Sequence, residues 1–349
     1  MKRLLFLCVF AFFLSSCSNN RSSITSIFGK IENISHISII QPEIAQSPYG
    51  LALYDTLLVW IDPYEGKNLS LFDLSNRKEI HRFGFIGQGP IETTAWPKGR
   101  KYQKDYFHIY DNQLRKILEF SIEDIAKDTL YQPKALKSFL EQTSISGVIQ
   151  VNDSLYVGEI SHSDSIYALV NDNGQMVFTG YTYPEDKAGN IPFNIKSFAY
   201  QGDFYQNPRD YNLLVHVGIN GIVIDILKIE NDKIVREKLL TYVLPKYKSV
   251  NHNGMVGALM DRDNIIGSCS VSVTSDFIYI LYADKTTVNE NNRSNKRCSD
   301  IILVFDWEGK PIKYYKSDID LYQICISEDD KYMYGVIMNP EVELVKFAL

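Results

Sequence analysis

The chain has 349 residues, 36 of them basic and 42 acidic, and a formal net charge of −6. This acidic balance, without a long basic run, argues against nucleic acid as a partner. The 23 tyrosines and 18 phenylalanines, together with the lack of a sustained 3.6-residue apolar period, favour strands and an all-β fold.

The N-terminal segment is predicted to be a targeting signal. Lys2 and Arg3 precede an apolar run of 11 residues at 4–14. A run of this length is too short to span a bilayer as a stable helix, but it suits the core of a signal peptide.

The apolar run ends in the motif Leu-Ser-Ser-Cys at residues 14–17. This motif resembles the lipobox of bacterial lipoproteins, in which the cysteine is lipidated and becomes the first residue of the mature chain. The resemblance implies a signal peptide at 1–16, a lipid anchor on Cys17 and a tether at 17–30. Several acyl chains on one cysteine hold a protein firmly to a membrane. The alternative is an ordinary secretory signal with a chance cysteine.

An aspartate followed by an alternating apolar run recurs six times after the tether, at intervals of 48 to 66 residues. Aspartate suits the turn before a strand, because its carboxylate bonds local backbone N–H groups. The alternation indicates a half-buried strand. The six residues are Asp55, Asp105, Asp153, Asp210, Asp276 and Asp330.

Each copy continues with a further apolar strand, a turn and a returning strand, and a short strand precedes most of the aspartates. Four antiparallel strands per unit, repeated six times, are typical of a six-bladed β-propeller. A β-sandwich with irregular spacing is the alternative. The returning strands are expected at residues 78–83, 129–133, 175–180, 233–242 and 310–316.

The sixth unit lacks an outer strand. Residues 342–349 suit its third strand, and residues 34–41 suit the fourth, arriving from the N-terminal side. Pairing of these two segments closes the last blade and leaves no exposed strand edge in the ring. The propeller is therefore predicted over residues 31–349.

The stretch at 72–92, which reads FDLSNRKEIHRFGFIGQGPIE, resembles the six-bladed, TolB-like propeller lipoproteins common in Bacteroidetes. In that family an outer strand ends in a glycine-rich junction. Ile91 departs from the pattern, because it replaces the usual second glycine. The resemblance implies a fold and a location in the cell envelope. It implies no reaction or ligand, because the family has no agreed activity. The matching residues are Gly84, Gly87, Gly89, Pro90 and Glu92.

This junction is predicted to be structural. It lacks the Gly-Lys-Ser/Thr ending of a phosphate loop and no helical pattern follows it. Glycines there allow a positive φ and a close backbone approach between blades, and Pro90 fixes the direction of the chain. No histidine pair has metal-ligand spacing, and the calcium-like run at 261–264 lacks a closing glutamate, so no metal or cofactor is expected. Buried free thiols are the expected state of Cys269, Cys298 and Cys325.

Three long irregular segments, at 183–194, 245–267 and 284–298, are predicted to share one face of the ring. In a four-stranded blade, the connections between blades and between the second and third strands emerge on the same side. Long loops on a rigid scaffold concentrate binding residues. Aromatic and arginine side chains dominate binding hot spots, although each of those chosen here also suits a structural role. The candidate binding residues are Arg82, Trp96, Tyr183, Phe193, His252 and Arg262.

The function indicated by the sequence is a non-enzymatic binding or scaffold module in the cell envelope, for a protein or glycan partner. The alternative is a propeller-type lyase or glycoside-active enzyme. The tether lacks the acidic cluster linked to surface export in Bacteroidetes. By this resemblance we expect a lipid-anchored monomer at the outer membrane, facing the periplasm.

Overall fold

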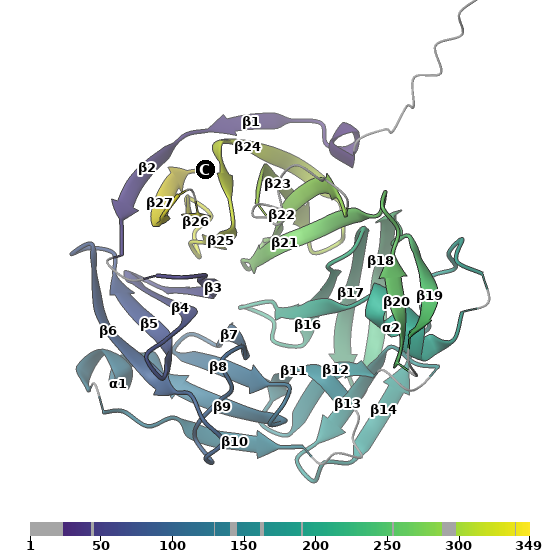
Figure 1. Cartoon of the computed structure of the whole chain (residues 1–349), viewed down its shortest axis with the longest axis horizontal. Helices are drawn as coiled ribbons and strands as arrows, with labels where there is room; N and C mark the ends of the chain where they lie inside the picture. The colour runs from purple at the N-terminus through teal and green to yellow at the C-terminus, as the bar shows by residue number, and fades with distance from the viewer. Residues whose placement is uncertain are drawn as a thin grey trace, which may run out of the picture.

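The computed structural model describes residues 24–42, 45–128, 130–139, 145–160, 164–189, 191–252, 255–287, 298–338 and 340–349. Its strands form six antiparallel four-stranded blades arranged in a ring around a central channel (Figure 1). This arrangement confirms the predicted six-bladed β-propeller.

Blades one to three follow the chain in order, each from the channel outward. Blade one contains β3 (Tyr49–Tyr54), β4 (Leu57–Tyr64), β5 (Lys67–Asp73) and β6 (Lys78–Phe85). Blade two contains β7 (Lys98–Tyr102), β8 (Tyr106–Asp111), β9 (Lys116–Ser121) and β10 (Lys134–Ser138). Blade three contains β11 (Ile145–Asn152), β12 (Leu155–Ile160), β13 (Tyr167–Asn171) and β14 (Met176–Gly180).

Blades four to six continue the same order, and the last of them is completed from the N-terminal side. Blade four contains β15 (Gly202–Gln206), β16 (Leu213–Gly218), β17 (Ile222–Glu230) and β18 (Lys233–Val243). Blade five contains β21 (Ile265–Val273), β22 (Phe277–Thr286), β23 (Ser299–Asp306) and β24 (Pro311–Leu321). Blade six contains β25 (Gln323–Ile326), β26 (Tyr332–Met338), β27 (Val342–Ala348) and β2 (His36–Ile40).

The strands that follow the repeated aspartates are buried on both faces. In β4, the four residues from Leu58 to Ile61 are all fully buried. The sequence predicted half-buried strands instead. The difference arises because the middle of each blade packs against a neighbouring blade on both sides, so side chains of both orientations enter a core. The outer strand β14, in contrast, is mostly exposed or half-buried.

The N-terminal segment closes the ring as predicted. Strand β2 pairs antiparallel with β27, with His36 opposite Phe347. The preceding strand β1 (Ile31–Ile34) pairs in parallel with β24 of blade five. One continuous segment therefore joins the outer edges of blades five and six, as the outermost ribbon of Figure 1 shows.

The folded part begins before the predicted boundary at residue 31. The short 3-10 helix η1 (Ile24–Ile27) packs on blade five, where Ile24 is buried. Phe28 follows it and meets the Phe305 ring edge-on, with 5.2 Å between ring centroids. Part of the segment assigned to the tether therefore belongs to the core of the propeller.

One predicted outer strand is wrong. Residues 129–133 were expected to form the edge of blade two, but β10 forms that edge, and helix α1 (Ile122–Lys127) precedes it. The side chain of Ser121 caps α1 by accepting from the backbone N–H of Asp124. Ile122 and Ile125, three positions apart, bury one side of this helix.

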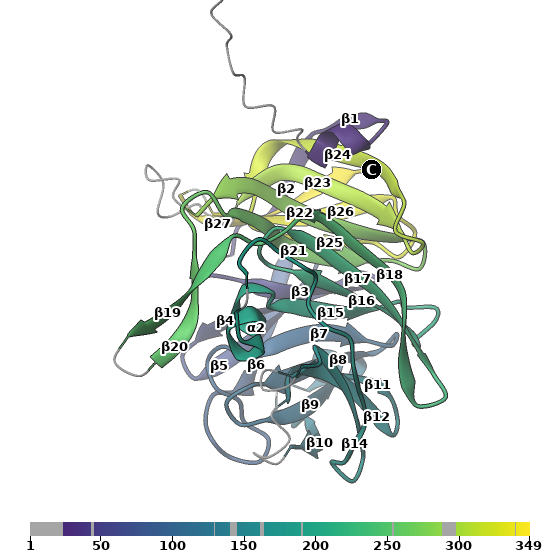
Figure 2. The ribbon, with the colours of Figure 1, turned by 90° about the vertical axis from the view of Figure 1, so that its right-hand side faces the viewer.

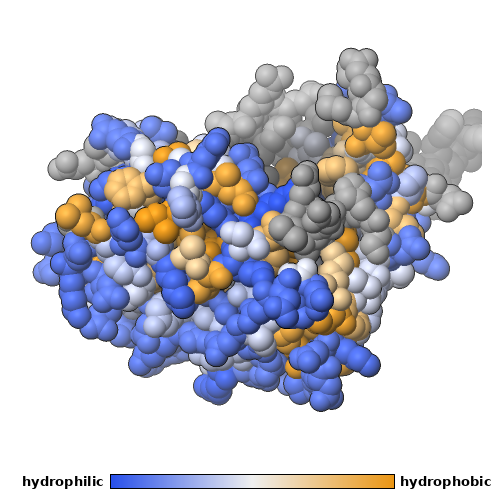
Figure 3. All heavy atoms as spheres, turned by 90° about the horizontal axis from the view of Figure 1, so that it is seen from below, coloured by the Kyte–Doolittle hydropathy of each residue, from blue (hydrophilic) through white to orange (hydrophobic). Residues whose placement is uncertain are grey.

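The segment between blades four and five forms a hairpin of β19 (Tyr247–His252) and β20 (Met255–Met260). Figure 2 shows it projecting from one face of the ring, with helix α2 (Phe193–Ala199) beside it. The wall of the ring in Figure 3 is largely hydrophilic, with small apolar patches. None of the helices in the described ranges has the length and apolar character to cross a membrane.

Candidate binding site in the central channel

The innermost strands of the six blades surround a cavity of about 480 Å³ along the axis of the ring. This volume lies within the range of pockets for small ligands. Strands β3, β7, β11, β15, β21 and β25 all contribute lining residues.

Strand β7 brings two cationic side chains to one side of the channel. Lys98 and Arg100 are two positions apart, so they point to the same side of the strand. The residue between them must be small. A Cβ at Gly99 would lie 2.4 Å from the Phe107 ring and 2.6 Å from Ile61, so this glycine allows β7 to pack closely against its neighbours.

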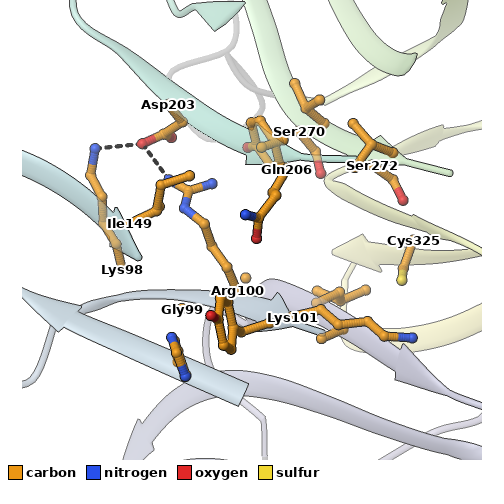
Figure 4. A pocket seen from close by; sticks show the side chains of 18 of the residues that line it. Lys98, Gly99, Arg100, Lys101, Ile149, Asp203, Gln206, Ser270, Ser272 and Cys325 are labelled. Atoms are coloured by element: carbon orange, nitrogen blue, oxygen red, sulfur yellow. Dashed lines mark hydrogen bonds and ion pairs between the residues drawn. The ribbon is translucent and has the colours of Figure 1, made fainter. Parts of the chain in front are cut away.

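Asp203 on β15 faces both cations across the channel (Figure 4). Its Oδ1 accepts from Lys98 Nζ at 2.5 Å and from Arg100 Nη2 at 2.8 Å. Burial on its own would raise the pKa of Asp203, but Lys98 and Arg100 outweigh it and lower the pKa to about 2. The carboxylate therefore stays ionised near neutral pH, which makes it a fixed charge rather than a proton donor.

A second carboxylate lies behind this group and is already bonded. Glu159 Oε1 is 2.9 Å from His216 Nε2 and accepts from the backbone N–H of Gly202 at 3.1 Å. His216 is buried. This pair holds the start of β15, the strand that carries Asp203, against blade three.

Arg100 also stacks on an aromatic ring of β15. Its guanidinium carbon lies 4.6 Å from the centroid of Tyr205. Burial and the nearby Asp203 raise the pKa of Tyr205 to about 12, so its hydroxyl stays neutral. In Figure 4, Gln206 lies beside Arg100, and its Nε2 donates to the backbone carbonyls of Val151 and Tyr211.

The mouth of the channel carries an exposed aromatic platform. The side chain of Trp96, two residues before Lys98, is 66% exposed and stacks on Tyr49 with 6.0 Å between ring centroids. The Tyr49 hydroxyl donates to the carbonyl of Pro97 at 2.9 Å, and this bond fixes the Tyr49 ring on which Trp96 stacks. A flat apolar surface therefore lies beside the charged group of β7 and β15.

Lys101 follows Arg100 on β7 and points to the other side of the strand. Lys101 Nζ bonds Glu328 at 2.6 Å and the Leu53 carbonyl at 2.9 Å. The nearby thiol of Cys325 is buried, and burial raises its pKa to about 11. Cys269, Cys298 and Cys325 form no disulfide; Cys298 and Cys325 are buried as expected, whereas Cys269 is partly exposed. The low thiolate content of Cys325 makes it unreactive.

Of the six candidate residues chosen from the sequence, Trp96 lines the channel. Arg82 lies on β6 with its side chain 13% exposed, where it donates to the backbone carbonyl of Asp62 and pairs with the carboxylates of Asp62 and Glu79. These contacts give Arg82 a structural role in blade one, outside the lining of the channel.

Tyr183 and Phe193 join an aromatic cluster beneath the β19–β20 hairpin. The Tyr183 ring is 6.1 Å from Phe193 and 5.2 Å from Tyr200. Asp186 accepts from the hydroxyls of Tyr200 and Tyr247, at 2.8 Å each. The segments at 183–194 and 245–267 therefore meet on one face of the ring, as predicted.

Arg262 is exposed in the turn between β20 and β21. The side chain of His252 lies outside the described residues, as does most of the third long segment at 284–298. The structure therefore brings Tyr183 and Phe193 together, and it places Trp96 separately at the channel mouth.

The glycine junction between blades one and two is held in shape by its own carboxylate, and Lys116 bonds it to blade two. Glu92 folds back so that its Oε2 accepts from the N–H of Gly89 at 2.8 Å. A Cβ at Gly87 would lie 2.0 Å from the same oxygen, so a larger residue would displace it. Lys116 of blade two donates to the Gly89 carbonyl at 2.5 Å, next to Pro90. Gly84 has a φ of +70° at the end of β6.

Sequence reasoning missed Lys98, Arg100 and Asp203. A positional signal was available, because the strand directly before each repeated aspartate lines the channel. The run before Asp105 contains Lys98 and Arg100 at alternate positions, and the run before Asp210 contains Asp203. Within the described ranges, no group of three or more potential ligands that could hold a metal ion is found.

Comparisons with known proteins agree with the observed architecture. A family model described as TolB-like 6-blade propeller-like matches residues 28–329. A protein of Bacteroides fragilis described as exported shares 13% identity, with a TM-score of 0.53 over 92% of this chain and 98% of its own. A DUF4221 family member from Bacteroides vulgatus shares 11% identity, with a TM-score of 0.53 over 91% and 98%. At these identities the likeness shows the fold alone. No curated protein matches the chain.

Proposed function

Because this chain belongs to the TolB-like six-bladed propeller family, we propose that it is a lipid-anchored envelope protein that binds the end of a glycan in its central channel. The observation that carries this proposal is the mouth of the channel. There the exposed Trp96 ring, stacked on Tyr49, borders a cavity of about 480 Å³. An aromatic platform beside charged hydrogen-bonding groups suits a sugar, which has an apolar ring face and polar edges.

Binding without catalysis fits the charges in the channel. A general acid or base works best when its pKa is near the operating pH. Asp203 has a pKa of about 2 because Lys98 and Arg100 outweigh the effect of its burial. It is therefore poorly suited to proton transfer, which favours a binding module over the lyase or glycosidase alternative.

The lipid anchor belongs to the proposal through the motif at residues 14–17. The B. fragilis neighbour is described as exported, which agrees with a location outside the cytoplasm. Cys17→Ser should release the chain from the membrane fraction, measured by fractionation in detergent-free buffer. A variant that stays membrane-bound would refute the anchor but leave the glycan site open.

The glycan function is tested with the full-length protein, purified in detergent, on an array of neutral and acidic glycans. We expect selective binding that Trp96→Ala abolishes. Phe198→Ala is the matched control, because Phe198 is an aromatic residue on α2 that is 46% exposed and lies outside the channel lining. Equal loss in both variants would argue against the channel mouth.

The same two variants also test the alternative that the partner is a protein rather than a glycan. One outcome is that the array shows no glycan binding while the parent protein captures one envelope protein. If Trp96→Ala loses that capture and Phe198→Ala retains it, the partner is a protein. That result would overturn the glycan proposal and keep the channel mouth as the binding site.

A further inference from the structure

Arg100 has more hydrogen-bond donors than its partners in the described part of the chain use. A guanidinium offers five N–H groups in a planar fork. Asp203 accepts from Nη2, and Tyr205 contacts the group through its ring and its hydroxyl. The side chain of Arg100 is 15% exposed and lines the cavity. The donors that Asp203 and Tyr205 do not use are therefore available to a ligand in the cavity.

The balance of charged side chains around Arg100 also favours binding of an anionic ligand. Two cations, Lys98 and Arg100, share one oxygen of a single carboxylate, Asp203. The next carboxylate, Glu159, is bonded to His216 and to a backbone N–H. Lys101 points to the other side of β7 and pairs with Glu328. The contact group of β7 and β15 therefore holds one more basic side chain than acidic ones, in a chain whose net charge is −6.

Resting on the proposed glycan-binding function, we propose that the ligand is an acidic sugar, and that Arg100 with Lys98 binds its carboxylate while Trp96 contacts the sugar ring. A planar carboxylate matches the guanidinium fork, and charge-assisted bonds of this kind are the strong ones. A neutral hydroxyl would use the same donors without the ionic attraction. Trp96 and Arg100 line the same cavity, and Trp96 lies four residues before Arg100 at the entrance to β7.

The test compares two ligands that differ in the charge of their carboxyl groups and in the methyl groups that esterification adds. Trigalacturonate and its fully methyl-esterified form are titrated into the full-length protein by calorimetry. Tryptophan fluorescence is the second readout, since Trp60 and Trp307 are buried and a ligand at the mouth quenches Trp96. We expect the acid to bind about tenfold or more tightly than the ester, as for loss of one charge-assisted hydrogen bond.

Variants connect this preference to the guanidinium. Arg100→Gln should remove the difference between acid and ester, and Arg100→Lys should restore only part of it, because an ammonium lacks the fork. Lys313→Gln is the matched control. Lys313 also pairs with a carboxylate, Glu32, and lies over a ring, Tyr315, but on the outside of the ring of blades. It should leave the preference unchanged, and melting temperatures check that all variants fold.

Each outcome separates this inference from the function on which it rests. If the protein binds the ester or neutral glycans as tightly as the acid, the carboxylate site is refuted and the glycan function stands. If no glycan binds, citrate replaces trigalacturonate in the same titrations. Citrate binding that Arg100→Gln abolishes would keep the anion site and refute the glycan function. If neither citrate nor any glycan binds, both are refuted.

Discussion

Two groups of aromatic residues include side chains from connections between blades, and they differ in how far their polar atoms are bonded internally. Beneath the hairpin, the hydroxyls of Tyr200 and Tyr247 both donate to Asp186, whose carboxylate is almost fully buried. At the channel mouth, Trp96 is 66% exposed and rests on Tyr49. Composition is similar in the two groups, but the first is internally satisfied and the second leaves an aromatic face open to a ligand.

The difference indicates which group holds the fold and which is available to bind. Burial and the bond to Asp186 both raise the pKa values of Tyr200 and Tyr247, so their hydroxyls remain neutral donors. Aromatic residues in such a cluster contribute buried area and fixed hydrogen bonds. An exposed ring contributes little to stability, because it keeps most of its contact with water.

Removing the strand that closes the ring should lower stability more than any substitution in the two aromatic groups. Deleting residues 34–41 removes β2, exposing the edge of β27 and the apolar side chains beside it. We expect aggregation or a large fall in melting temperature, measured by scanning fluorimetry and size-exclusion chromatography. A deletion variant as stable and monomeric as the parent would show that β2 is dispensable.

Tyr200→Ala should lower stability by about 3–5 kcal/mol, as for other buried aromatic residues replaced by alanine. Tyr200 is 5% exposed and packs against Tyr183 at 5.2 Å. The milder Tyr200→Phe keeps the ring and should cost about 1 kcal/mol, for one hydrogen bond to Asp186. Urea unfolding measures both. If Tyr200→Ala unfolds like the parent, the hairpin cluster is not structural and the contrast with the channel mouth fails.

The charges of the channel should be visible in acid unfolding. Because the folded pKa of Asp203 is about 2, below its ordinary 3.8, this carboxylate contributes stability that is present above about pH 4 and lost as the pH falls towards 2. The expected contribution is on the order of 1–2 kcal/mol. Urea unfolding at several pH values should show a flatter acid dependence for Asp203→Asn than for the parent.

An ion pair on the surface provides the control for the Asp203→Asn measurement. Asp300 lies 3.6 Å from Lys316 on the outer part of blade five, so Asp300→Asn should change the acid dependence little. If the Asp203 and Asp300 variants behave alike between pH 4 and 2, the contacts of Asp203 with Lys98 and Arg100 do not stabilise the fold.

The repeat made the fold predictable from the sequence, because each blade begins its second strand with an aspartate turn. Ring closure followed from counting strands. The outer strand of blade two was not predictable by the same pattern, since Ser121 caps a helix that moves the strand to β10. The cap itself is readable, as Ser121 precedes two isoleucines three positions apart.

The site was less predictable, because residue type does not report burial. Arg82 and Trp96 are both hot-spot types near the glycine junction, yet Arg82 is bonded to Asp62 and Glu79 while Trp96 is exposed. Arg100 and Asp203 are 103 residues apart in sequence and meet only because the innermost strands converge on one axis. A pair this far apart in sequence cannot be predicted without knowing how the ring closes. The exposure of Trp96, in contrast, can be expected because it lies in a loop.

The smallest stability effect belongs to Trp96. Trp96→Ala should change the free energy of unfolding by less than about 0.5 kcal/mol, because the ring is 66% exposed and contacts mainly Tyr49. The same variant should lose glycan binding on the array, since the platform at the channel mouth is removed. Tyr200→Ala should do the opposite, lowering the melting temperature while the folded protein still binds. If Trp96→Ala unfolds as readily as Tyr200→Ala, the channel mouth is a structural cluster like the one beneath the hairpin.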